Sequence, residues 1–106
     1  MAYEVEIADS AKAELDEIVR YIAETLANPT AARKLLDDFF NQKNFLYENP
    51  YTYPLCPIQS LQRKGYRRFI FMKNYVALYI VDDSPDKKVV TIMHIFYAKR
   101  DYEKLV

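Results

Sequence analysis

Hydrophobic and polar residues alternate strictly at the start of the chain. The stretch "AYEVEIA" places Tyr3, Val5 and Ile7 on one side of an extended backbone and Glu4 and Glu6 on the other. This two-residue period is typical of a strand with one buried face and one exposed face. The stretch is therefore predicted to form a strand of a sheet.

Apolar residues then recur every three or four positions in two successive segments, which is the pattern of amphipathic helices. Asp9 or Ser10 is predicted to cap the first helix, whose apolar stripe is Ala11, Leu15, Ile18, Val19, Ile22 and Leu26. Asn28 is predicted to cap the second helix, with Pro29 at its first position and a stripe of Leu35, Leu36, Phe39, Phe40 and Leu46. The short connection predicts an antiparallel helical hairpin that covers one face of a sheet.

The residue composition of the chain changes after the proline-rich stretch "ENPYTYPLCP", which is predicted to be an ordered loop. Three runs rich in β-branched and aromatic residues follow, "GYRRFIFM", "NYVALYIV" and "KVVTIMHIFY", separated by a tight "KN" turn and by "DDSPDK". They predict an antiparallel meander. The fold class is α+β with the order β-α-α-β-β-β, the first strand lies at a sheet edge, and residues 1–106 form a single domain with one core.

Charge is distributed unevenly along a chain whose formal net charge is zero. Residues 1–50 contain ten acids and five bases, whereas residues 51–106 contain five acids and ten bases. An anionic partner is therefore expected to meet the C-terminal half. A lone Cys56, no signal-peptide pattern and no long apolar run predict a cytoplasmic protein without a disulfide or a membrane span.

The order of the elements, together with the motifs "NPYTYPLCP", "GYRRF", "YVALYIVDD" and "YAKRDYEKL", resembles the RelE/ParE superfamily of toxins from bacterial type II toxin-antitoxin systems. The resemblance implies a growth-arresting toxin that a cognate antitoxin neutralises, and it implies no cofactor. Superfamily members divide chiefly into ribosome-dependent mRNA endonucleases of the RelE type and DNA gyrase inhibitors of the ParE type. The target is therefore expected to be either gyrase or the ribosome with its mRNA.

Cleavage of RNA through its own 2′-hydroxyl requires a proton acceptor, cationic donors for the charged transition state and a proton donor for the leaving oxygen, but no metal. Arg67, Arg68 and Arg100 are the candidate cations, because a guanidinium group fits phosphate oxygens. Tyr97 and Tyr102 are the candidates for base stacking or proton transfer. These five residues are the predicted site.

Two positions depart from the RelE pattern. Val76 and Phe69 stand where RelE-type toxins carry basic residues, so we favour the ParE-like function of gyrase inhibition. The mRNA endonuclease is the alternative, and a non-toxic module that only binds an antitoxin is the second alternative. An acidic or amphipathic antitoxin segment is expected to lie across the basic sheet face and the helical hairpin. The oligomeric state of that complex stays open.

His94 is the only histidine of the chain. Counting alternate positions along the last strand places it on the same face as Val90, Ile92 and Phe96, opposite Met93, Ile95 and Tyr97. It is predicted to be a packed or partly buried structural residue.

Overall fold

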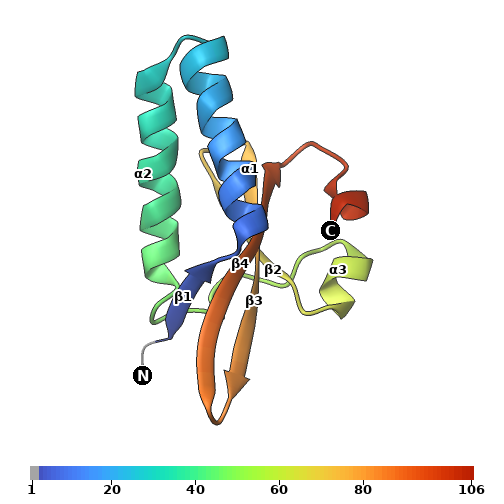
Figure 1. Ribbon diagram of the computed structural model, residues 1–106. Helices are drawn as coiled ribbons and strands as arrows, with labels where there is room; N and C mark the ends of the chain where they lie inside the picture. Colours follow the sequence, from blue (N-terminus) through green and yellow to red (C-terminus); the bar gives the residue numbers. More distant parts are fainter. Residues whose placement is uncertain (1–2) are drawn as a thin grey trace.

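The computed structural model describes residues 3–106, so position 2 of the predicted first strand lies outside the described residues (Figure 1). The elements are β1 (Glu4–Ile7), α1 (Asp9–Arg20), the π-helical turn η1 (Tyr21–Thr25), α2 (Pro29–Phe45), α3 (Gln59–Arg63), β2 (Arg67–Phe71), β3 (Tyr75–Ser84), β4 (Lys87–Tyr97) and the 3₁₀ turn η2 (Tyr102–Leu105). The predicted α+β class and element order are confirmed. The short helices α3 and η2 were not predicted.

The four strands form one sheet in the order β1-β4-β3-β2. Strands β2, β3 and β4 make the predicted antiparallel meander, and β1 joins its edge by pairing in parallel with β4. The turn between β3 and β4 is only two residues long, because Ser84 pairs with Lys87 and most of "DDSPDK" belongs to the strands. At the β2–β3 turn, Met72 and Lys73 adopt positive φ angles.

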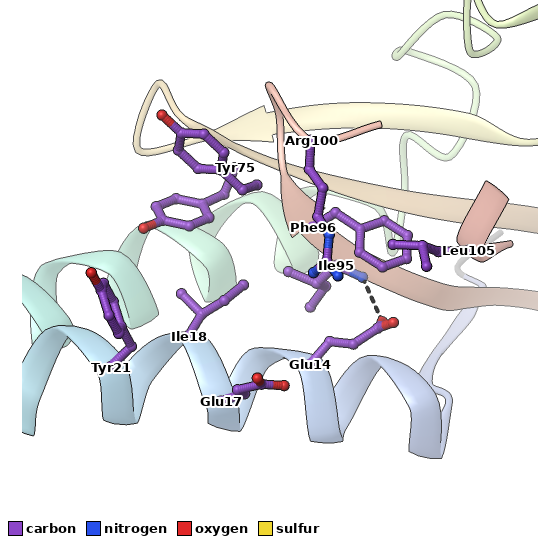
Figure 2. Close-up of a pocket in the computed structure, with 10 residues that line it drawn as sticks. Glu14, Glu17, Ile18, Tyr21, Tyr75, Ile95, Phe96, Arg100 and Leu105 are labelled. Atoms are coloured by element: carbon purple, nitrogen blue, oxygen red, sulfur yellow. Dashed lines mark hydrogen bonds between the residues drawn. The ribbon is translucent and has the colours of Figure 1, made fainter. Parts of the chain in front are cut away.

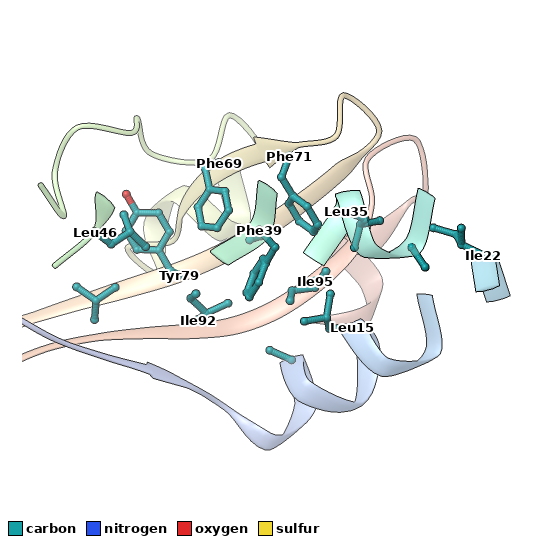
Figure 3. Close-up of a cluster of buried hydrophobic side chains, with 14 residues drawn as sticks. Leu15, Ile22, Leu35, Phe39, Leu46, Phe69, Phe71, Tyr79, Ile92 and Ile95 are labelled. Atoms are coloured by element: carbon teal, nitrogen blue, oxygen red, sulfur yellow. The ribbon is translucent and has the colours of Figure 1, made fainter. Parts of the chain in front are cut away.

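Buried side chains cover both faces of the sheet, so the prediction of one core was wrong. On the helix side, Phe39 of α2 packs against Phe69 and Phe71, with ring centroids 6.1 and 5.3 Å away (Figure 3). On the opposite face, α3, η2 and the proline-rich loop cover a second cluster of Cys56, Leu61, Tyr66, Val76, Leu78, Phe96 and Tyr102. This double burial explains why the middle of β3 is an uninterrupted apolar run.

The ends of the helices agree only partly with the sequence predictions. The Asn28 side chain accepts a hydrogen bond of 3.1 Å from the Ala31 backbone N–H, which confirms the predicted cap of α2. The cap prediction for α1 was wrong, because Ala8 occupies the cap position and no side chain caps it. Leu26, predicted in the first apolar stripe, follows η1 and is 55% exposed.

A β-bulge in β4 reverses the predicted alternation of that strand. Leu78 pairs with His94, but the next residue Tyr79 pairs with Ile92, so Met93 has no partner in β3. As a result Ile92 and Ile95 both face the helices, while His94 stacks on Phe96 on the other face with ring centroids 5.3 Å apart. The predicted grouping of His94 with Val90 and Ile92 was therefore wrong, and so was the placing of Met93 on the opposite face, because the inserted residue shifts the parity.

We expect Asn28→Ala to lower the free energy of unfolding by about 1 kcal/mol, because the Ala31 N–H loses its acceptor. Chemical denaturation followed by circular dichroism measures the change. Asn28→Asp keeps an acceptor oxygen and serves as the matched control. Equal stability of the alanine variant and the parent chain would contradict the assigned cap.

Candidate functional site

Strand β4 extends beyond the end of its neighbour β1, and α1 closes the open edge that remains. The Ala8 N–H donates to the Ile92 carbonyl at 2.9 Å, which is the last backbone bond along this edge. Beyond it, the Ser10 hydroxyl donates to the Met93 carbonyl at 2.7 Å, and Glu14 Oε1 accepts from the Ile95 N–H at 2.9 Å. Helix side chains therefore replace a strand along this edge.

Glu14 also holds the single histidine. Its Oε2 lies 3.1 Å from His94 Nδ1, and both side chains are partly buried. This contact and the stacking of His94 on Phe96 agree with the predicted packed, partly buried histidine. One carboxylate thus fixes both a backbone N–H and an imidazole ring of β4.

A groove of about 530 Å³ opens between the same two elements. Helix α1 and η1 form one wall, and the start of β3, the end of β4 and the residues that follow β4 form the other (Figure 2). Its lining consists of Glu14, Glu17, Ile18, Tyr21, Tyr75, Ile95, Phe96, Tyr97, Arg100 and Leu105. The volume is in the range of ligand-binding clefts, so this groove is the candidate functional site.

Two of the five predicted site residues lie in this groove. Tyr97 is exposed and makes an edge-to-face contact with Tyr75, with ring centroids 5.8 Å apart. Arg100 follows β4, and its backbone N–H donates to the Tyr97 carbonyl at 3.0 Å in a tight turn. Figure 2 shows the Arg100 side chain directed toward the α1 wall.

Arg68 and Tyr102 lie together on the face of the sheet that carries the second core. Arg68 Nη1 donates to the Tyr102 hydroxyl at 3.3 Å. Tyr102 is only 3% exposed and its ring stacks on Phe96 with centroids 5.6 Å apart. Burial raises the pKa of Tyr102 above its ordinary value. Tyr102 is therefore placed as an anchor of the C-terminal turn and does not line the groove.

Arg67 occupies a third place, because neighbouring residues of a strand point to opposite faces. Its Nη1 donates to the Tyr53 carbonyl at 2.8 Å, and its guanidinium lies 4.9 Å from the centroid of the Tyr51 ring. Burial and the hydrogen bond to Asp83 raise the pKa of Tyr51 to about 12. The five predicted residues are thus distributed over three separate places.

The groove contains residues that the sequence analysis did not select. Glu14, Glu17 and Tyr21 lie on one helical face, and Tyr75 opens β3. Spacings of three and four residues between positions 14, 17, 18 and 21 place those residues on one side of a helix. This spacing is visible in the sequence, but the sequence prediction concerns only the core-facing stripe of the helix.

The family described as "ParE toxin of type II toxin-antitoxin system, parDE" matches residues 5–102. The chain belongs to the ParE toxin family. A solved structure described as "Chromosomal ParDE TA system from P. aeruginosa" resembles this ParE-family chain with a TM-score of 0.72. The two are 20% identical, and the match covers 92% of this chain and 98% of that one, so it supports the shared fold.

A comparison of this ParE-family chain with curated proteins found no match. Within residues 3–106, no helix combines the length and the apolar character that a membrane crossing requires.

We expect Glu14→Ala to destabilise the toxin by roughly 1–3 kcal/mol, because it leaves the buried Ile95 N–H without an acceptor. Glu14→Gln retains an Oε1 acceptor and is expected to lose less. Urea unfolding measures the stability, and amide hydrogen exchange reports on Ile95 directly. Glu17→Ala is the matched control on the same helix. An Ile95 amide that exchanges equally slowly in Glu14→Ala would contradict the edge closure by Glu14.

Proposed function

We propose that this ParE-family toxin arrests growth by inhibiting DNA gyrase and that a cognate antitoxin neutralises it. Family membership supports a toxin of a type II system. The choice of gyrase over mRNA depends on one observation, which is that the candidate cations do not converge on one point. Arg67 and Arg68 leave β2 on opposite faces, and Arg100 lies in the groove beside α1.

Separated cations are a poor arrangement for cleaving RNA. Several donors must surround one phosphate while its charge develops, and each missing donor costs about 3 kcal/mol of transition-state stabilisation. The hydroxyl of Tyr102 is already engaged by Arg68, and the ring is buried. Inhibition by binding to a protein does not require the arginines to surround a single phosphate.

The two positions that depart from the RelE pattern support the same choice. Val76 is fully buried in the second core, and Phe69 is buried beside Phe39 in the first. A cation at either position would lose its hydration without a partner, so both positions contribute to packing.

The antitoxin is proposed to bind through a segment that has both acidic and apolar residues. The groove offers an apolar floor of Ile18, Ile95 and Phe96 with the exposed guanidinium of Arg100 beside it. An amphipathic segment that places an acid against Arg100 satisfies both features.

Purified gyrase with relaxed plasmid and ATP tests the proposed target. We expect the folded toxin to block supercoiling, and preincubation with the antitoxin to restore it. Relaxation of supercoiled plasmid by a type I topoisomerase is the control for nonspecific DNA effects and should proceed unchanged. Full supercoiling at a large excess of toxin would overturn the proposal. In that case, codon-phased cuts of a reporter mRNA in a translating extract would favour the mRNA endonuclease. The absence of such cuts would favour the non-toxic module that only binds an antitoxin.

Arg100→Ala is expected to raise the toxin concentration needed for half-maximal inhibition of gyrase by about tenfold, because an exposed arginine at an interface contributes strongly to binding. Its stability should change by less than about 0.5 kcal/mol. Arg33→Ala, which removes an exposed arginine from α2, is the matched control. Unchanged inhibition by Arg100→Ala would remove Arg100 from the functional surface.

A further inference from the structure

Several tyrosine rings of this chain are already covered by the chain's own cations. These cation–π pairs, with the distance from the cation to the ring centroid, are Arg67 over Tyr51 at 4.9 Å, Lys43 over Tyr47 at 5.2 Å and Lys88 over Tyr3 at 5.8 Å. The face of an aromatic ring carries negative charge and attracts a cation.

Three tyrosines at one end of the groove differ from that pattern. Tyr21 of η1, Tyr75 of β3 and Tyr97 of β4 come from separate elements and line the same space. Tyr21 is 54% exposed and Tyr97 43% exposed. Among residues 3–106, no lysine or arginine lies over any of these three rings, and the hydroxyl hydrogen bonds of the chain come from other tyrosines. Tyr75 contacts the rings of Phe71 and Tyr97, while Tyr21 has no ring partner in the same part of the chain. The tyrosine end of the groove therefore has unused capacity for a cation.

The charges around the groove favour the same occupant. Both oxygens of Glu14 are engaged, by the Ile95 N–H and by His94. Glu17 lines the α1 wall and has no ion pair within the described part of the chain. The basic residue of the lining, Arg100, comes from the opposite wall, and Figure 2 shows its side chain beside Ile95, between the tyrosine end of the groove and Leu105.

We propose that the end of the groove formed by Tyr21, Tyr75 and Tyr97 binds a lysine or arginine side chain of a protein partner, with Glu17 as its counter-charge. The inference rests on the proposed function in one respect, that the cation belongs to a protein that the toxin binds. Three tyrosine rings and one carboxylate line this end of the groove, and sites that recognise ammonium groups combine aromatic rings with negative charge in the same way. An anion is a poor occupant, because the ring faces and Glu17 repel it.

A titration with a small cation tests this site without gyrase or antitoxin. The full chain, labelled on its tyrosines, is titrated with tetramethylammonium chloride while the ring signals are followed by NMR. tert-Butanol is the neutral probe of similar shape, and sodium chloride at equal concentration controls for ionic strength. We expect saturable shifts of Tyr21, Tyr75 and Tyr97 with tetramethylammonium, and much smaller shifts with the other two additives.

Two substitutions measure how much Glu17 and Tyr97 contribute to tetramethylammonium binding. Glu17→Gln is expected to weaken tetramethylammonium binding about two- to fivefold, because it removes a surface charge pair. Glu24→Gln removes an exposed acid that does not line the groove and should leave the binding unchanged. Tyr97→Leu is expected to weaken binding by a similar factor through loss of one ring face.

Equal shifts with tetramethylammonium and tert-butanol would overturn the inference, because they would show a merely apolar cleft. The same affinity in Glu17→Gln and Glu24→Gln would overturn the role of Glu17. Neither result bears on the supercoiling assay, so a failure of this site and a failure of gyrase inhibition are separate outcomes.

Discussion

The carboxylate of Glu14 is the contact on which the geometry of the site depends. A sheet edge exposes backbone groups that must be satisfied, and β4 continues past β1 for several residues. Glu14 satisfies one of these groups at Ile95 and holds His94 at the same time. This contact holds helix α1 against the edge of β4. The groove lies between β4 and the following turn of the helix, which contains Glu17 and Ile18.

The packing of α1 on β4 also decides the electrostatic character of the site. The N-terminal half of the chain is acidic and the C-terminal half is basic, so the sequence alone predicts that an anionic partner meets the C-terminal half. In the fold, an acidic helix forms the wall opposite Arg100. The groove is consequently bipolar, which suits a protein segment carrying both signs of charge better than a uniformly anionic polymer.

Periodicity predicted the elements well and their faces less well. The alternation in β1, the Asn28 cap and most of the two helical stripes follow from local chemistry, and the structure reproduces them. Leu26 and Phe40 are the exceptions, because they are 55% and 43% exposed. The bulge at Met93 could not be read from alternation, because one inserted residue inverts every later position.

The candidate site was only partly predictable for a related reason. Tyr102 belongs to a short polar tail that is typical of an exposed segment, yet it is buried because Phe96, turned by the bulge, offers a ring to stack on. Arg67 and Arg68 are adjacent in sequence and therefore diverge in a strand. Their adjacency in the sequence suggested that the two arginines act together, but the strand directs their side chains to opposite faces of the sheet.

The turn η2 links the packing of the second core to the shape of the groove. Tyr102 closes the second core, and the segment just before it carries Arg100 into the groove. Removal of residues 98–106 would take away part of the groove wall and at the same time uncover apolar surface of the second core. Such a truncation would thus produce an unstable polypeptide, which cellular proteases remove, and not a folded chain that lacks only one wall of the groove.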